Sequence, residues 1–419
     1  MRPEILAPVG SMEALNAALA AGCDAVYFGL PSFGARAFAN NFDLETTKEV
    51  IERCHLCGVK VYITMNTILY EDEMEDAYNM AKKVHLFGVD ALIIQDLGFI
   101  HLLHHRLPNL VLHASTQLSI SNPYQIEQLK KLGVKRVVLA RECTKEEVQA
   151  CVDTGIEVEV FVHGALCICY SGQCYFSSVH YGRSGNRGMC AQPCRMKYSL
   201  YEDGNKVDTH GDYVLSPKDL SLIDEVNTLA DMGVCSLKIE GRMKSAPYVY
   251  ESVSQVKKVL ENMERSHLDE QNLRVTFNRE YTVGHMYGAS GKELMNSKTC
   301  NHQGIEIGRV VKVNKNKICI QLSQDLHQND GIRFERENLG CHVNFMYDKK
   351  QKLISFMPKN NTVLIEGPVG VHVGSVVRKT MDSELNKTIE EKIRTSNRQS
   401  KVNAIVTCSA VGKPMVMEV

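Results

Sequence analysis

Residues 20–29, AAGCDAVYFG, join the end of a helix-like stretch to a glycine and a short apolar run. The same pattern recurs as LCGVKVYITM (56–65), LFGVDALIIQ (86–95), KLGVKRVVLA (131–140), DTGIEVEVFV (153–162) and DMGVCSLKIE (231–240). A glycine directly after a helix adopts the left-handed conformation at little cost, so each copy predicts a helix end. The four or five apolar residues that follow predict a strand buried on both faces.

Two further strands lack this glycine, EILAPVGS (4–11) and LVLHAST (110–116), and they bring the total to eight. Amphipathic stretches such as LETTKEVIERCHL (44–56) separate most of the strands. Eight such units in about 245 residues predict an α/β fold, a (β/α)8 TIM-like barrel over residues 1–265. A doubly wound open sheet is the alternative, but it favours a GxGxxG turn after its first strand, and APVGSMEA lacks that spacing.

The composition excludes several classes of protein. The 419 residues carry a formal net charge of −1 and 44% hydrophobic residues, without a bias towards nucleic acid or membrane. The start, MRPEILAPVG, does not resemble a signal peptide, and no apolar run approaches the roughly 18 residues that cross a bilayer. The 15 cysteines are scattered, which disfavours a small secreted disulfide scaffold. We therefore expect a cytoplasmic protein without membrane or DNA partners.

Chemistry in such a barrel takes place at the carboxyl ends of its strands. Any one polar residue there is as readily explained by solvation or a salt bridge, so only the converging set is informative. The residues expected at these ends are Asn66, Asp96, His113, Ser115, Gln117, Arg141, Glu142, His163, Lys238, Glu240 and Arg242.

Glu159 alternates with two valines in EVEVFV (157–162). If the valines face the helices, Glu159 points into the barrel, where a carboxylate needs a partner such as Lys238 or Arg242. We expect His113 and Glu159 to act in acid–base chemistry, together with Lys238 and Glu240. The candidates for substrate binding are Asn66, Gln117, Arg141, His163 and Arg242.

A cysteine-rich insertion at residues 164–215, here called the cysteine segment, separates the seventh strand from the eighth. Its cysteines Cys167, Cys174, Cys190 and Cys194 are separated by 6, 15 and 3 residues. Only the last pair has the spacing of a structural zinc site, whereas an iron–sulfur cluster tolerates wider gaps. Packing thiols, or one nucleophilic cysteine near His163, are the alternatives. Cys169 is a fifth thiol in the same stretch.

The same segment has no acidic residue from Val160 to Tyr201. Its basic residues alternate with tyrosines and a phenylalanine, a pattern typical of single-stranded nucleic-acid binding. The predicted RNA contacts are Arg183, Arg187, Arg195 and Lys197. A partner-protein surface or a loop folded on the barrel rim is the alternative.

These motifs resemble the signature of peptidase family U32. The matching residues are Glu159, Phe161, GALC (164–167), Gly172, Cys174, Ser177, RSGNRGMCAQPCR (183–195), SPKDL and KIEGRMKS (within 216–245), LAPVGS (6–11) and STQLSISN (115–122). The family name reflects a collagenase-like peptidase assignment. Relatives are associated with oxygen-independent or prephenate-dependent hydroxylation of ribosomal RNA cytidine, of tRNA wobble uridine, or in ubiquinone synthesis. GNRGMCAQPCR most resembles the ribosomal RNA branch.

The resemblance implies a [4Fe–4S] cluster on Cys167, Cys174, Cys190 and Cys194. Cys169 is interpreted as a packing thiol, because its neighbour Cys167 matches the family pattern. It also implies prephenate, or a similar small carboxylate, as co-substrate, for which Arg141, Lys238 and Arg242 are suited because Arg binds carboxylates bidentately. Many relatives have a cysteine ligand after the Lys-Asp-Leu motif, but here that position is Ser221. Cys194 is therefore taken as the fourth ligand, with Cys235 a weaker candidate.

Two other functions stay open. One is a peptidase, although the chain has neither an HExxH helix nor a GxSxG turn. The other is a tRNA uridine hydroxylation factor or a non-catalytic, metal-stabilised RNA-binding protein.

The residues after about 270 have a different pattern of polar and apolar positions from the barrel. Residues 270–380 alternate between polar and apolar positions with turn signals such as Asn329-Asp330-Gly331, which predicts a small all-β barrel. Residues 381–419 are expected to form a charged helical linker and the start of a truncated third domain.

Overall fold

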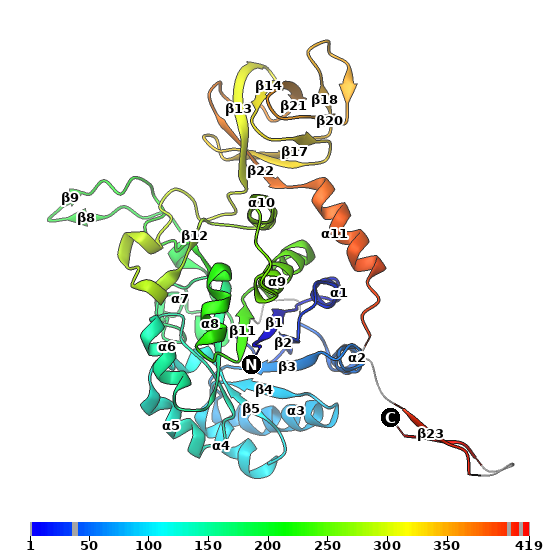
Figure 1. Ribbon diagram of the computed structural model, residues 1–419. Helices are drawn as coiled ribbons and strands as arrows, with labels where there is room; N and C mark the ends of the chain where they lie inside the picture. Colours follow the sequence, from blue (N-terminus) through cyan, green and yellow to red (C-terminus); the bar gives the residue numbers. More distant parts are fainter. Residues whose placement is uncertain (1, 36–40, 400–403, 410–413, 419) are drawn as a thin grey trace.

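The computed structural model describes residues 2–35, 41–399, 404–409 and 414–418, and a closed barrel of eight parallel strands forms its larger part (Figure 1). The strands are β1 (Glu4–Pro8), β2 (Ala25–Gly29), β3 (Lys60–Met65), β4 (Ala91–Ile94), β5 (Leu112–Ala114), β6 (Arg136–Val138), β7 (Glu157–Ala165) and β11 (Ser236–Ile239). Each pairs in parallel with its neighbour in chain order, and β11 pairs with both β7 and β1. The predicted barrel is confirmed, and the open sheet is excluded.

Helices alternate with the strands, and their ends follow from the sequence. Ser11 Oγ accepts a hydrogen bond from the Ala14 N–H before the first helix, and Gly22 ends that helix at φ 93° with its N–H donated to Ala18 O. The helices of the barrel are α1 (Met12–Ala21), α2 (Leu44–Leu56), α3 (Met74–Leu86), α4 (Leu97–Arg106), α5 (Pro123–Lys131), α6 (Lys145–Val152), α8 (Val226–Asp231) and α9 (Ala246–Leu260).

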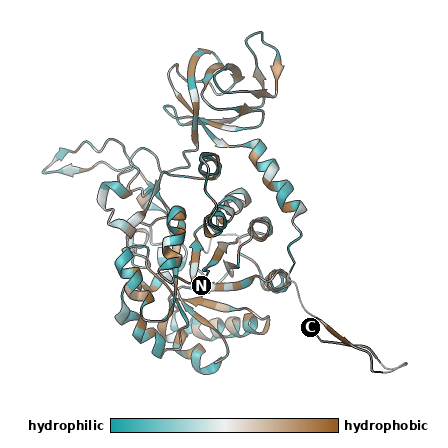
Figure 2. Ribbon diagram, in the orientation of Figure 1, coloured by the Kyte–Doolittle hydropathy of each residue, from teal (hydrophilic) through white to brown (hydrophobic). Residues whose placement is uncertain are grey.

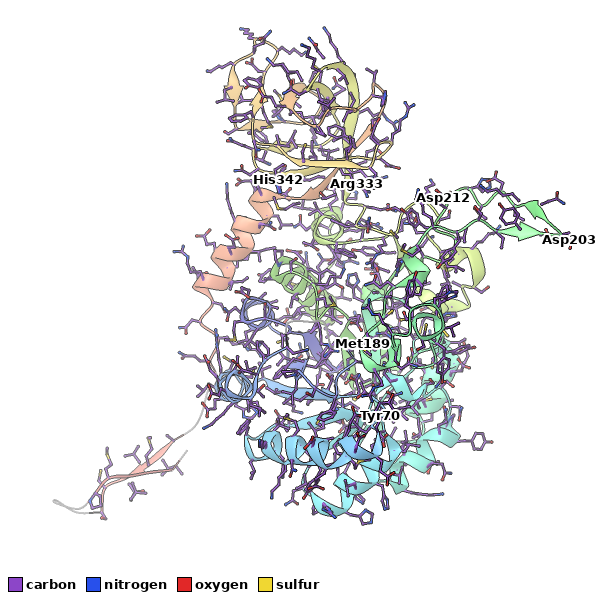
Figure 3. The ribbon with its side chains drawn as sticks, turned by 180° about the vertical axis from the view of Figure 1, so that it is seen from behind. Tyr70, Met189, Asp203, Asp212, Arg333 and His342 are labelled. Carbon is purple, nitrogen blue, oxygen red and sulfur yellow. The ribbon has the colours of Figure 1, made fainter. Side chains whose placement is uncertain are left out.

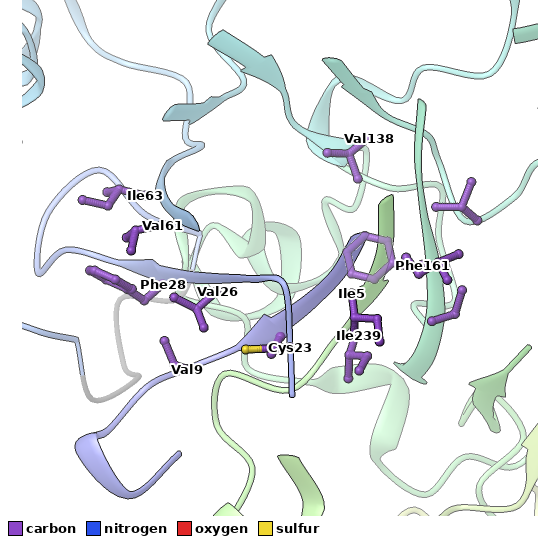
Figure 4. Close-up of a cluster of buried hydrophobic side chains, with 14 of the residues drawn as sticks. Ile5, Val9, Cys23, Val26, Phe28, Val61, Ile63, Val138, Phe161 and Ile239 are labelled. Carbon is purple, nitrogen blue, oxygen red and sulfur yellow. The ribbon is translucent and has the colours of Figure 1, made fainter. Parts of the chain in front are cut away.

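Alternation along the strands separates two sets of buried side chains. Ile5, Val26 and Phe28 belong to the main core (Figure 4). Leu6 and Tyr27, which alternate with them, belong to a separate smaller cluster. Figure 2 shows hydrophobic strands enclosed by helices that carry hydrophilic residues as well. Other inward positions, such as Glu159 and Lys238, carry charged side chains.

The cysteine segment leaves the barrel after β7 and returns beside it. β10 (Asp219–Ser221) pairs antiparallel with the end of β7, so that Asp219 lies opposite Ala165, and it also pairs with β12 (Tyr281–Thr282). The segment contains α7 (Phe176–Tyr181), the 3-10 turns η3 (Gly185–Arg187) and η4 (Pro193–Arg195), and a hairpin that projects from the body (Figure 1). The hairpin strands are β8 (Tyr201–Glu202) and β9 (Asn205–Lys206).

The β domain begins at residue 305, later than the predicted boundary at 270. Residues 267–276 form α10 (His267–Thr276), and β12 still belongs to the barrel sheet. An eight-stranded antiparallel sheet follows: β13 (Ile305–Asn314), β14 (Lys317–Leu322), β16 (Gly331–Phe334), β17 (Leu339–His342), β18 (Met346–Tyr347), β19 (Leu353–Ile354), β21 (Thr362–Glu366) and β22 (Val376–Met381). A small pair, β15 (Leu326–His327) and β20 (Phe356–Met357), lies beside it.

A helix returns the chain from the β domain to the barrel. α11 (Ser383–Thr395) packs Leu385, Ile389 and Ile393 against the barrel core. Beyond it, Arg398 donates hydrogen bonds to the carbonyl oxygens of Cys23 (2.6 Å) and Cys57 (3.2 Å), at the ends of α1 and α2. The last described strands are β23 (Ile405–Thr407) and β24 (Val416–Glu418). None of the described helices is long and apolar enough to cross a membrane.

Candidate functional site

The cysteine segment lies across the mouth of the barrel, the end at which the strands finish. Arg187 pairs with Glu73 in the loop after β3 (2.5 Å), and this contact holds the pKa of the Glu73 carboxyl below its ordinary value. Gly172 lies so close to the loop after β5 that a Cβ there would be 2.0 Å from Gln117 O. Figure 3 labels Met189 of the segment above Tyr70, which also belongs to the loop after β3. The segment therefore covers the mouth.

Five thiols of this segment lie in one neighbourhood: Cys167, Cys169, Cys174, Cys190 and Cys194. Burial, opposed by the charge of Arg195 and supported by the charges of Cys167, Cys190 and Cys174, raises the pKa of Cys194 to about 11. The Cys190 sulfur accepts hydrogen bonds from the Gln192 N–H (3.3 Å) and from the Ser177 hydroxyl (3.7 Å). Burial, and then the charges of Cys169, Cys167 and Cys190, raise the pKa of Cys174. Cys169, predicted to be a packing thiol, therefore belongs to the same group, and the four-cysteine ligand set stays a prediction.

Cysteine thiols can ligate either a single metal ion or an iron–sulfur cluster. Within the described part of the chain, no three His, Cys, Asp or Glu side chains form a site for a metal ion. A single zinc ion requires sulfurs about 2.3 Å from one point, whereas an iron–sulfur cluster spaces its cysteines around a larger inorganic core. The cysteines offer sulfur ligands, and the hydrogen bonds donated to the Cys190 sulfur are of the kind found at cluster ligands. Cys235, the weaker candidate, lies elsewhere and donates to Val158 O (3.1 Å) at the start of β7.

Glu159 lies inside the barrel, as expected, and is fully buried. Its carboxylate is 2.7 Å from Lys238 Nζ and 3.3 Å from Arg136 Nη1. Burial alone would raise the pKa of Glu159, but these two cations hold it below its ordinary value. Lys238 is therefore confirmed as a partner. Arg242 is not a partner in these contacts and donates to Thr64 Oγ1 (3.0 Å).

Arg136 was missed by the sequence reasoning, although an arginine in a buried strand requires acidic partners. It lies 2.8 Å from Glu157, also pairs with Glu4, and thereby connects the amino ends of β6, β7 and β1. His113 lies close to this cluster, edge-on to Tyr62 with 4.8 Å between ring centroids. Burial, followed by the charge of Arg136, lowers the pKa of His113 well below its ordinary value. His113 is thus a neutral group deep in the barrel and not at its mouth.

Polar side chains converge at the mouth itself. Arg141 Nη2 lies 2.7 Å from Glu240 Oε2, and its guanidinium stacks 3.8 Å from the centre of the Phe161 ring. Asn66 Nδ2 donates to Ser115 Oγ (3.2 Å). These contacts bring together groups from the ends of β3, β5, β6 and β11.

Three buried polar atoms at this end have no hydrogen-bond partner among the described residues: Gln95 Oε1, Arg141 Nε and Glu142 Oε2. An unpaired buried polar atom costs about 1–3 kcal/mol, so a ligand that pairs with it gains that energy. Gln95 escaped the sequence analysis, which selected its neighbour Asp96. Asp96 instead accepts the Phe99 N–H (2.8 Å) as the cap of α4.

His163 does not belong to the mouth. A register shift between Lys238 and Ile239 displaces the pairing of β7 with β11 at this point. The imidazole ring packs outside the barrel, 5.6 Å from the Tyr248 ring and 5.3 Å from the Tyr281 ring. Burial lowers the pKa of His163 to about 3. Its predicted role in substrate binding is therefore not supported by its position.

The four predicted RNA contacts divide into two groups. Arg183 and Lys197 are exposed, with Lys197 3.1 Å from Asp212. Arg187 binds Glu73 and stacks over Tyr70 at 4.3 Å. Arg195 is buried and donates to groups of the protein, so its guanidinium is not presented to a nucleic acid.

Comparison with known proteins gives one family. The sequence model of peptidase family U32 matches residues 10–296. The chain is 35% identical over 359 residues to the 23S rRNA 5-hydroxycytidine C2501 synthase of Escherichia coli (strain K12), which is 82% of this chain and 54% of that protein. It is 40% identical over 267 residues to the tRNA hydroxylation protein P1 of Bacillus subtilis (strain 168), which is 62% of this chain and 63% of that protein.

A third relative carries a peptidase name. The chain is 34% identical over 333 residues to the collagenase of Porphyromonas gingivalis (strain ATCC BAA-308 / W83), which is 74% of this chain and 80% of that protein. The matches to the two RNA-hydroxylation relatives thus span only 54% and 63% of their lengths.

Proposed function

The chain belongs to peptidase family U32, and from this premise we propose that it is an RNA-modifying enzyme that hydroxylates a pyrimidine base. The observation that carries the proposal is the barrel mouth, where buried polar atoms without partners lie beneath a segment that gathers four thiols. Two relatives with RNA-hydroxylation names support the reaction class.

The proposed oxygen donor is prephenate or a similar small carboxylate, bound at the mouth. Arg141 is suited to a carboxylate because its guanidinium is planar and its Nε–H is buried without a partner. Arg242 is a second cation near this end, on the turn after β11. Lys238 lies deeper and neutralises Glu159, so its proposed role is to maintain the charge balance of the interior. The covering segment excludes water from the bound acid.

The proposed cofactor is a [4Fe–4S] cluster held by Cys167, Cys174, Cys190 and Cys194. When bound, such a cluster supplies one-electron chemistry or an iron site next to the mouth. The protein itself orients the ligands: the Gln192 N–H and the Ser177 hydroxyl hold the Cys190 sulfur through hydrogen bonds. Hydrogen bonds to ligand sulfurs of this kind tune a cluster's reduction potential.

A cytidine of large-subunit ribosomal RNA is the proposed substrate. The 35% identity to the ribosomal RNA synthase extends over 82% of this chain, more than the 62% matched by the tRNA relative. A tRNA uridine is the second candidate, favoured by the higher identity of that shorter match. In either case, Arg183 and Lys197 are exposed cations of the cysteine segment, a side-chain chemistry suited to phosphate groups.

A peptidase function finds less support in the barrel. The collagenase relative is the observation in its favour. Among the described residues, however, neither His113 nor His163 has a serine or cysteine as hydrogen-bond partner, and burial lowers the pKa of both rings. A histidine that activates a nucleophile needs such a contact.

The test is mass spectrometry of ribosomal and transfer RNA nucleosides from a deletion strain. We expect one hydroxylated pyrimidine to disappear and to return with the wild-type gene. Arg141→Met and Cys190→Ala should not restore it, whereas Arg106→Met, on the exposed face of α4, should. An unchanged nucleoside profile in the deletion strain would contradict the proposal.

A further inference from the structure

Arg195 is a cation that the fold buries beside two of the four thiols. Only 9% of the residue is exposed, and it directly follows Cys194. Its Nη2 donates to Leu166 O (3.3 Å), the residue before Cys167. Its Nη1 donates to Ser216 Oγ (2.8 Å) and to Pro217 O. One guanidinium therefore ties the start, the middle and the end of the cysteine segment together.

The contacts use the geometry of arginine. The guanidinium is planar and presents five donors in a rigid fork, whereas lysine has one flexible ammonium group. Two nitrogens of Arg195 donate to three acceptors on two separate stretches of the chain: Leu166 O on one, and Ser216 Oγ and Pro217 O on the other. A lysine could keep the charge at this position but not the set of contacts.

The hydrogen bonds leave the charge of Arg195 without a balancing anion. All three acceptors, a hydroxyl and two carbonyl oxygens, are neutral. The nearby carboxylate, Asp219, is already bound to Arg279 (3.0 Å). A buried charge is costly unless an opposite charge accompanies it. Cys194 directly precedes Arg195, and Cys167 directly follows Leu166, whose carbonyl oxygen accepts from Arg195, so two of the predicted cluster ligands adjoin this cation.

We propose that Arg195 is a positioning residue that fixes Cys167 and Cys194 in place and balances the negative charge of the iron–sulfur cluster they hold. The charge-balancing part rests on the proposed function, because it requires the cluster. The positioning part concerns contacts within the chain and is measurable without it. The role assigned to Arg195 therefore changes from a predicted RNA contact to a residue that supports the cofactor site.

The positioning part is tested on the apoprotein by hydrogen–deuterium exchange of residues 164–198. Arg195→Gln and Arg195→Lys should both accelerate exchange around Cys167 and Cys194 by about tenfold. Neither side chain can make the full set of hydrogen bonds that the planar guanidinium makes. Ser216→Ala removes one acceptor and gives a milder variant should the arginine variants fold poorly. Lys197→Gln is the matched control, with the same change of charge at an exposed site, and should exchange like the wild type.

The charge part is tested by redox titration of protein purified under argon. A positive charge beside a cluster stabilises its reduced form, so Arg195→Gln should shift the reduction potential to more negative values. Arg195→Lys should stay near the wild-type potential, and Lys197→Gln should not shift it.

The outcomes separate the two proposals. Wild-type protein without iron would overturn the charge part and the cluster of the proposed function, while the exchange experiment still decides the positioning part. Wild-type protein with a cluster, but with unchanged exchange and potential in Arg195→Gln, would overturn the inference alone. An equal shift in potential from Lys197→Gln would show that no specific charge at Arg195 is needed.

Discussion

Removing Lys238 should destabilise the barrel strongly, because it leaves Glu159 in the interior without its shorter ion pair. The two side chains are 5% and 0% exposed, and the ion pair is 2.7 Å long. Removing one partner of such a pair costs about 3–5 kcal/mol, since the remaining charge is desolvated and uncompensated. Arg136 stays 3.3 Å away, which places Lys238→Met at the lower end, about 3 kcal/mol. That is a large part of the 5–15 kcal/mol typical of a domain.

Urea unfolding followed by far-ultraviolet circular dichroism measures this loss, since the chain contains no tryptophan. Adding Glu159→Gln to Lys238→Met removes the orphaned charge and should restore at least half of the lost free energy. Strictly additive effects of the two substitutions, or a loss below about 1 kcal/mol for Lys238→Met, would refute the buried ion pair.

The ion pair between Glu159 and Lys238 should also make the free energy of unfolding depend on pH in the acidic range. The folded pKa of Glu159 lies below its unfolded value of about 4.3, so the pair's contribution to stability is complete above that pH. It is lost as the pH falls through the folded pKa. Unfolding free energy measured between pH 7 and pH 3 should therefore fall less steeply for Glu159→Gln than for the wild type.

Three further predictions concern single contacts. The His113 ring should stay neutral from about pH 8 to pH 5, so its NMR ring shifts should not titrate, and a midpoint near 6.5 would contradict its burial. Arg187→Met should cost no more than about 1 kcal/mol, because the pair is partly exposed, yet limited proteolysis should cut the cysteine segment faster. Gly172→Ala should cost more than about 2 kcal/mol in urea, because its Cβ would meet Gln117 O. Gly182→Ala also has a positive φ but has nothing within 4 Å, and an equal cost would refute the clash.

The eight barrel strands were predictable because a local signal marks most of them. Gly22 shows the mechanism, since its left-handed conformation ends α1 just before β2. The inward direction of Glu159 followed from alternation with the valines alone. Such features depend on residues close together in the chain.

The predictions were wrong or incomplete for residues whose positions depend on partners far away in the sequence. His163 continues the alternation of Glu159 and Phe161, and only the pairing with β11 reveals the register shift that turns it outwards. Arg195 has the sequence context of a nucleic-acid contact, but its acceptors come from the two ends of the cysteine segment. The Arg136 network joins three strands whose starts are far apart in sequence. Spacing within the chain does not contain this information.

The antiparallel pairing of β10 with the end of β7 places the two ends of the cysteine segment side by side. Joining neighbouring ends makes the barrel insensitive to what lies between them, because closing a longer loop adds free energy only logarithmically with its length. Evolution could therefore exchange or extend this cover without rebuilding the strands beneath it. Transplanting the segment between relatives that act on different RNAs is a direct way to separate target choice from the shared chemistry of the scaffold.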